Sequence, residues 1–310
     1  MAKRFICSSG QSKHIKFRQA SFDLLTDFLV NLNKSNKDKL DISSKFSGIF
    51  KDKRVIECIF LITRQLRLHP LIGYHAVELL ERFMIKRLKE LFTTHMLDGA
   101  AAAAQQRNYE DVVFEELKDK FPLIVFSCVQ LASKLDLHSN MIDTNTAVRF
   151  LQTVGHSVSK QIVLDSELMV LKGLEFNLNT PNPLIYVGVL LEVLGHNEPS
   201  TPLEQLHHLS SQVLQFVSLQ RTAIYDSLLR ATTQCVNPSR EQSEKFVTVT
   251  EDYMLLGVGV IAVASYILNV SKWKQVMEEL SHITGISQRS ISDFAHITLL
   301  HITRIDSSET

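Results

Sequence analysis

The chain has 310 residues, with 33 basic and 33 acidic side chains, and 45% of it is hydrophobic. The zero net charge excludes a protein that binds nucleic acid or an anionic membrane through the field of the whole molecule. Glycine (11) and proline (7) fall below their average usage of about 7% and 5%, so we expect long helices and few tight turns.

Motifs for catalysis or metal binding are missing from the sequence. Its four cysteines are Cys7, Cys58, Cys128 and Cys235, which form no CxxC pair, so neither a zinc site nor a disulfide framework is predicted. No phosphate-binding loop, dinucleotide fingerprint, zinc-protease motif or nucleophile elbow occurs. The adjacent His207 and His208 point to different helix faces. We therefore expect no enzyme, no metal and no cofactor, and interpret the chain as a binding module.

The first 42 residues are predicted to form a basic tail and a linker. No apolar stretch of signal-peptide length is present, although the lack of acidic residues before Asp23 leaves a mitochondrial presequence as an alternative. A short amphipathic piece at 22–32 leads into a stretch rich in Lys, Asn and Ser at 32–48. We interpret that stretch as a linker.

Apolar residues then recur at helical spacings of three and four. Before the break NLNTPNP at 177–183, helices are predicted at 55–66, 71–96, 122–137, 144–154 and 158–176. After the break they are predicted at 184–194, 203–229, 253–270, 273–283 and 287–305. An Ala-rich stretch predicts an exposed insertion at about 93–118. The pattern thus gives an all-α chain with five helices on each side of the break.

Residues 253–271 carry no charge over nineteen positions, which is within the length of a membrane span. Ser265, Asn269 and two tyrosines dilute the segment, and Thr248 with Glu251 suggests a capping box before it. A helix that is apolar all round also suits the centre of a helical bundle. We favour the core helix over the membrane span.

The two halves resemble each other. CVQLASKL around Leu131 aligns with VIAVASYIL around Val263, and FLQTVGHSVSKQI aligns with ELSHITGISQRSI, which sets Gly155 against Gly285. The offsets are 132 and 130 residues. This agreement suggests the duplication of one five-helix unit.

Two charged residues fall among apolar positions. Glu167 shares a helix face with Val163, Leu164, Leu171 and Leu174. Lys134 lies between Leu131 and Leu137 near the end of a very apolar helix. Such charges cost several kcal/mol unless they are paired or hydrogen-bonded. Three interpretations stay open: the two residues pair with each other, they face a partner, or they lie at the edge of their apolar faces.

These residues lie in segments that resemble cyclins. LASKLDL (131–137) and LDSELMVLKGLEFNLNTPNPLIYV (164–187) resemble the second half of an N-terminal cyclin box. RLHPLIGYHAVELLERFM (67–84) resembles the cyclin segment that ends in Asp-Arg-Phe, and VIAVASYILNVSKWKQVMEELSHITGIS (260–287) resembles the second box. The resemblance implies two tandem five-helix cyclin-like folds. The tail and linker at 1–42 precede a first box at 43–180, which includes the insertion, and a divergent second box at 181–305.

The resemblance also implies a partner site. In cyclins, the lysine of LASK and the glutamate of the fifth helix contact the activating helix of a cyclin-dependent kinase, and these positions fall on Lys134 and Glu167. Asp136 matches the first acidic residue after LASK. The substrate-docking pattern of the family falls on KDKRVIEC (51–58), where its Met, Arg and Trp are replaced, so recruitment of RxL-bearing substrates is not expected.

Among atypical cyclins, the whole chain is similar to a group that regulates meiotic crossover formation. This similarity implies a non-catalytic adaptor in nuclei of meiotic cells, associated with chromosomes and also present in the cytoplasm. Its partners would be proteins, among them crossover proteins or a cyclin-dependent kinase, and not a membrane. The alternatives are a conventional kinase-activating subunit and a nucleic-acid-binding scaffold of the transcription-factor-B type, and the balanced charge disfavours the latter.

Overall fold

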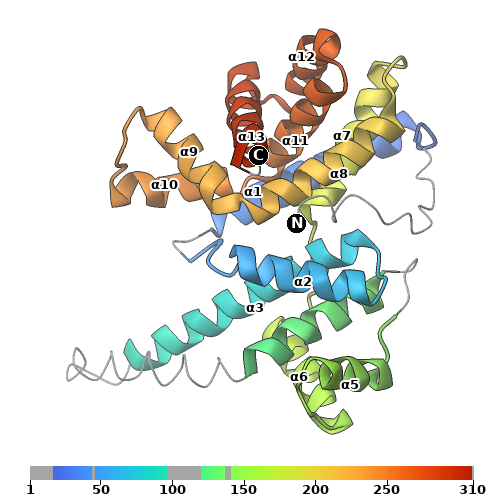
Figure 1. Cartoon of the computed structure of the whole chain (residues 1–310), viewed down its shortest axis with the longest axis vertical. Helices are drawn as coiled ribbons and strands as arrows, with labels where there is room; N and C mark the ends of the chain where they lie inside the picture. The colour runs from blue at the N-terminus through green and yellow to red at the C-terminus, as the bar shows by residue number, and fades with distance from the viewer. Residues whose placement is uncertain (1–16, 44–45, 97–119, 137–140, 309–310) are drawn as a thin grey trace. The chain divides into compact units, whose positions relative to one another are not determined.

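The computed structural model describes residues 17–43, 46–96, 120–136 and 141–308. Every regular element among these residues is a helix, and none of them lies in a β-strand (Figure 1). The expected all-α fold is therefore confirmed. The tail before Phe17 and most of the insertion expected at about 93–118 lie outside the described residues.

The helices account for most of the described residues. In chain order they are α1 (Phe22–Asp41), α2 (Lys53–Gln65), α3 (Pro70–Met96), a helix over 120–135, α5 (Thr144–Thr153), α6 (Lys160–Gly173), α7 (Pro183–Asn197), α8 (Leu203–Leu219), α9 (Arg221–Thr233), α10 (Arg240–Thr250), α11 (Tyr253–Leu268), η2 (Val270–Lys272), α12 (Trp273–Thr284) and α13 (Gln288–Ser308).

The chain divides into two compact units. Unit 1 contains Met1–Lys34, Tyr186–Leu214 and Met254–Thr310, and unit 2 contains Ser35–Ile185 and Gln215–Tyr253. The boundaries that the cyclin resemblance implies, at 42/43 and 180/181, stay a prediction.

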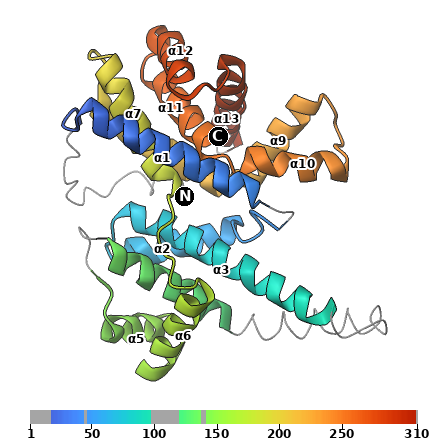
Figure 2. The ribbon, with the colours of Figure 1, turned by 180° about the vertical axis from the view of Figure 1, so that it is seen from behind.

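The core of unit 2 is built around the helix over 120–135. Every side chain from Ile124 to Ser133 in this helix is buried, which requires neighbours on all of its sides. The remaining core residues come from α2, α3, α5 and α6, with Ile142 just before α5 and Leu174 just after α6. Among these four, α2 packs on α3, α5 on α6, and α3 on α6 (Figure 2). Helices α2, α5 and α6 each bury one face, as the three- and four-residue spacing predicts, whereas α3 is buried on nearly all sides between Ile72 and Met84.

Unit 1 buries α11 in the same way. Val258, Ile261 and Ala264 are completely buried in this helix, as expected for a core helix. No single described helix is long and apolar enough to cross a membrane; α10 and α11 reach that length and composition only together, and they are bent by 73° at the break between them. At the other end of the unit, α12 packs on α13.

The internal repeat has a structural counterpart. Gly155 follows the end of α5 with φ +88°, and Gly285 caps the end of α12 with φ +72°. A left-handed residue at this place ends many helices and is usually glycine. Leu131 and Val263, the other aligned pair, are both buried. The alignment therefore matches helices with equivalent ends.

Three expectations on local structure were wrong. Helix α1 continues to Asp41 through half of the expected linker. The helix expected at 203–229 breaks at Gln220 into α8 and α9, and α10 follows where none was expected. Thr248 forms no capping box, because it lies inside α10, whose own box is formed by Ser239 and Gln242. Tertiary contacts account for the first difference, since the Asn36 side chain donates to Asp252 and accepts from the Tyr253 amide.

Unit 2 also buries several charged side chains, which we call the ionic cluster. Its members are Lys39, Lys51, Glu78, Arg221, Glu251 and Tyr253. They come from α1, the turn before α2, α3, the start of α9 and the junction of α10 with α11. A buried charge costs several kcal/mol unless it is paired. The cluster therefore fixes these segments relative to one another.

Glu251 is the centre of the ionic cluster. Its carboxylate lies 2.7 Å from Lys51 Nζ, 3.1 Å from Lys39 Nζ and 2.7 Å from Arg221 Nη2. Burial raises the pKa of a carboxyl group, but these three cations outweigh burial and hold the pKa of Glu251 well below its usual value. Burial lowers the pKa of Lys51, but Glu251 and Glu78 hold it well above the usual lysine value. Glu251 and Lys51 are thus charged in the folded protein, whereas burial and Glu78 raise the pKa of Tyr253 and keep its hydroxyl neutral.

Candidate partner-binding site

The start of α6 fixes the position of Glu167. The Ser159 side chain caps the helix by accepting a hydrogen bond from the Ile162 amide. Val163 and Val170, four residues before and three after Glu167, are both completely buried. These two valines hold one face of α6 in the core. Glu167 lies between them in the chain and is itself buried, with only 7% of its surface exposed.

The helix over 120–135 leaves the core in its last turn. Ser133 is completely buried, and its hydroxyl accepts a hydrogen bond from the Ile142 amide. The next two residues, Lys134 and Leu135, are exposed. Asp136 follows the end of the helix and is half-buried. Lys134 therefore stands where the central helix reaches the surface.

The structure brings Lys134 and Glu167 together. The Lys134 Nζ donates to Glu167 Oε1, while 34% of the lysine side chain and 9% of the glutamate side chain are exposed. Of the three interpretations of these charges, pairing with each other is the one observed. Contact with a partner, for these two residues and for Asp136, stays a prediction.

Exposed apolar side chains lie on the same two helices as the pair. Leu164 and Leu168, one turn apart on α6, are 44% and 42% exposed, and Leu135 beside Lys134 is 43% exposed. Leu164 was expected on the buried face and instead faces outward, whereas Val163 and Leu174 are buried as expected. A partly exposed ion pair among exposed leucines resembles the centre of a protein interface more than a solvated surface.

The end of α6 adds an aromatic side chain that the residue pattern did not single out. Glu175 and Phe176 both have left-handed backbones, with φ of 53° and 58°, which side chains other than glycine adopt at a cost. Phe176 is 64% exposed. The Lys86 Nζ on α3 lies 2.5 Å from Glu175 Oε1, and this hydrogen bond and charge lower the pKa of Glu175. The sequence did contain a signal for Phe176, because the cyclin-like segment LEFNL has a phenylalanine at the position where the cyclin pattern has one.

The site offers hydrogen bonds and apolar contacts. No group of three or more His, Cys, Asp or Glu side chains that could hold a metal ion exists among the described residues. What the described residues present at this place is a charged pair of opposite signs in an apolar surrounding. Such a surface suits the recognition of another protein.

Comparison with known proteins identifies full-length relatives. No protein-family profile matches the chain. Cyclin N-terminal domain-containing protein 1 from Mus musculus is 38% identical over 286 residues, which cover 92% of this chain and 85% of the relative. The Homo sapiens protein with the same name is also 38% identical over 286 residues and is covered to 86%. The similarity thus extends over nearly the whole length of each pair.

Proposed function

Because the chain belongs to the family of cyclin N-terminal domain-containing protein 1, we propose that it is a non-catalytic, cyclin-like adaptor that binds other proteins. It acts in the nuclei of meiotic cells, associated with chromosomes, where it promotes the formation and maturation of crossovers. Through its protein partners it links recombination to cell-cycle control. The resemblance of the whole chain supports the meiotic part of this proposal.

One observation carries the protein-binding part, namely the ion pair of Lys134 and Glu167 among exposed leucines. Exposed apolar side chains gain about 25 cal/mol for each Å² that a partner covers. A partner can also approach the paired charges with its own charged or polar groups, which gives specificity more than affinity. Asp136 adds an acidic group at the same end of the helix.

A cyclin-dependent kinase is the first partner to test, because the cyclin resemblance implies that Lys134 and Glu167 would contact such a kinase. The full-length chain is used to capture purified kinases of this class and purified crossover proteins, beside the double variant Lys134→Ala/Glu167→Ala. The matched control is Lys53→Ala/Glu57→Ala, which removes a Lys–Glu pair from the surface of α2. Circular dichroism must show that both variants are folded.

We expect the double variant to lose at least one captured partner and the control variant to keep it. A captured kinase that becomes active would assign the chain to the kinase-activating cyclins, and a captured crossover protein would assign it to the adaptors. Equal capture by the wild type and both variants would contradict a partner site at this place.

The meiotic role has a separate test in germ cells. The same two double variants replace the chromosomal copy, and foci that mark designated crossovers are counted in late meiotic prophase. We expect fewer foci with Lys134→Ala/Glu167→Ala than with Lys53→Ala/Glu57→Ala. A normal number of foci in cells that lack the protein entirely would contradict the meiotic proposal.

A further inference from the structure

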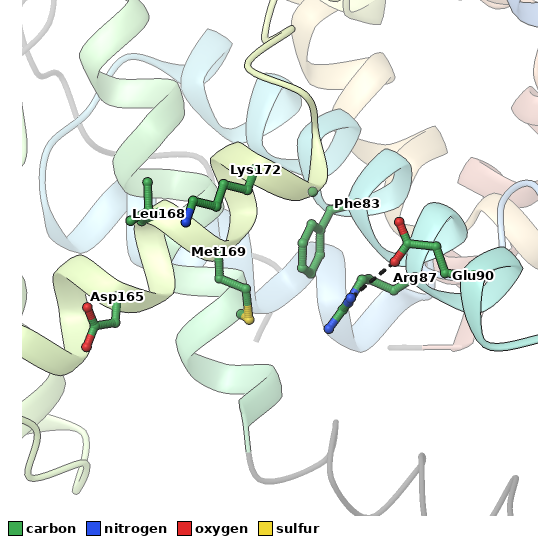
Figure 3. A pocket seen from close by; sticks show the side chains of 8 residues that line it. Phe83, Arg87, Glu90, Asp165, Leu168, Met169 and Lys172 are labelled. Atoms are coloured by element: carbon green, nitrogen blue, oxygen red, sulfur yellow. Dashed lines mark hydrogen bonds and ion pairs between the residues drawn. The ribbon is translucent and has the colours of Figure 1, made fainter. Parts of the chain in front are cut away.

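A cavity of about 410 Å³ lies between α3 and α6 in unit 2 (Figure 3). Each helix contributes residues three or four positions apart, which is one face of each helix. The lining residues are Phe83, Arg87 and Glu90 from α3, and Asp165, Leu168, Met169, Lys172 and Gly173 from α6. The cavity is therefore a short groove between two helix faces.

The inner part of this groove is apolar. Phe83 is 1% exposed and lies beside Gly173, where an added Cβ would come within 2.5 Å of its ring. Met169 is half-buried and points toward the same space as Phe83 and Arg87 (Figure 3). Leu168 on the rim is 42% exposed. A bulky apolar side chain of a partner would be removed from water by entering this place, which favours its binding.

The charged side chains around the groove differ in whether they have a partner. Arg87 is paired with Glu90 at 3.1 Å, and Asp165 accepts a hydrogen bond of 2.8 Å from the Gln161 side chain. Lys172 forms no ion pair with any residue in the described ranges. Asp165 likewise has no cationic partner among those residues, and it lies seven residues, about two turns of α6, before Lys172. The end of the groove at Lys172 thus offers a cation beside apolar side chains, which complements an acidic group next to an apolar one.

We propose that this groove binds a short segment of a protein partner, in which a bulky apolar residue stands close to an aspartate or glutamate. The apolar side chain enters between Met169 and Phe83, and the carboxylate pairs with Lys172. The inference rests on the proposed function in one respect only, namely that the ligand is a protein. The groove uses α3 and the face of α6 that carries Met169 and Lys172. It shares Leu168 with the surroundings of the Lys134–Glu167 pair, but neither residue of that pair lines it.

Displayed peptides provide the test. Random twelve-residue peptides are selected on the immobilised full-length chain, and the enriched peptides are synthesised with a fluorophore for anisotropy titrations. We expect the enriched sequences to combine Leu, Met or Phe with a nearby Asp or Glu. Lys172→Glu and Met169→Lys should each weaken binding by about tenfold or more, which corresponds to about 1.4 kcal/mol.

Two control variants make the result specific. Lys160→Glu introduces the same charge change at the first residue of α6, outside the groove, and should leave binding within about twofold. Lys134→Ala/Glu167→Ala removes the proposed partner site and should leave peptide binding unchanged. Thermal unfolding must show that every variant is folded; Lys172→Glu lies on the surface and provides a second probe if Met169→Lys unfolds the protein.

Three outcomes would overturn the inference. No sequence is enriched over a surface coated with the Lys172→Glu variant, or the enriched peptides bind that variant with unchanged affinity. In the third outcome, the Lys134→Ala/Glu167→Ala variant no longer binds the peptides, whereas the Lys172→Glu variant still binds them. This last result would support the proposed partner site while excluding the groove, so the two proposals fail separately.

Discussion

Lys51 and Glu251 are separated by 200 residues in the chain, and their Nζ and Oε2 atoms lie 2.7 Å apart in the folded protein. Only 4% and 2% of these side chains are exposed. The turn before α2 is therefore joined to the junction of α10 with α11 by two charges that water does not reach. A segment from the second half of the sequence is in this way part of the core that the first half builds.

Removal of the charge of Glu251 should destabilise the protein strongly. Glu251→Gln keeps the shape of the side chain and leaves three cations without their common anion. We expect the free energy of unfolding to fall by about 3–5 kcal/mol, measured by urea denaturation of the full-length chain. The control Glu241→Gln disrupts a pair on α10 in which both side chains are 77% exposed, and should cost under about 1 kcal/mol. Equal losses would contradict a buried, ionised cluster.

Acid should unfold the protein through the same carboxylates. The pKa values of Glu251 and Glu78 are held below the usual 4.5, so the unfolded chain binds more protons than the folded one around that pH. Their stabilising contribution is present above about pH 4.5 and is lost as the pH falls below it. Burial raises the pKa of Glu81, which opposes this trend weakly. Melting temperatures between pH 7 and 3 should fall more steeply for the wild type than for Glu251→Gln.

Lys39 should give the opposite dependence in mild alkali. Burial lowers the pKa of Lys39 to about 8, against 10.5 for an ordinary lysine. Between these values the unfolded chain binds the extra proton, so the contribution of Lys39 to stability should rise with pH. Burial raises the pKa of the Cys58 and Cys128 thiols, which act in the other direction equally in the wild type and both variants. Lys39→Met should remove the rise, whereas Lys37→Met, which changes an exposed lysine of the same helix, should keep it. The free energy of unfolding should be compared between about pH 8 and 9.5. Above pH 10, the raised pKa values of buried tyrosines make stability fall with rising pH.

Exchange of the two charges at the candidate partner site should separate stability from binding. Lys134→Glu/Glu167→Lys can re-form the pair with reversed polarity, whereas Lys134→Ala alone leaves a mostly buried carboxylate unpaired. We expect the single variant to lose roughly 1–2 kcal/mol and the exchanged double variant to recover most of it. Capture of the partner should be lost in both variants. Full binding by the exchanged variant would show that partner binding does not depend on which of the two positions carries the positive charge.

Gly173 should not tolerate a side chain. An added Cβ would meet the Phe83 ring at 2.5 Å, so Gly173→Ala must displace a buried aromatic ring at a cost of about 1–3 kcal/mol. A Cβ added at Gly188 in α7 would have no neighbouring atom within 4 Å. Gly188→Ala should therefore be neutral or gain up to about 1 kcal/mol from helix propensity. Urea denaturation of both variants tests the contrast, and equal effects would mean that α3 and α6 adjust freely.

Much of the helical core was predictable because it depends on periodicity. Residues such as Ile56, Ile59 and Ile62 lie three apart and are buried on one face of α2, as the spacing indicates. The pairing of Lys134 with Glu167 was one of three interpretations, since helical spacing gives the face of a residue and not its partner across the core. The family resemblance, and not the pattern, singled out these two positions.

The ionic cluster was not predictable from local sequence. Lys39 stands in a polar stretch that has the composition of a linker, and Glu251 stands where an acidic residue commonly caps a helix. Glu251 is buried and Lys39 half-buried because segments far apart in the chain meet there. The same contacts explain why α1 extends to Asp41, since tertiary contacts override a weak local preference.

The ionic cluster also limits how the sequence can change over generations. Loss of Lys51 alone, or of Glu251 alone, upsets the balance among the remaining buried charges. An apolar pair at these two positions does not restore the balance, because Arg221 then also lacks its carboxylate partner. Every route from the ionic cluster to an apolar one passes through less stable intermediates. Substitutions within the cluster are therefore expected to be inherited together, as a case of epistasis between distant residues.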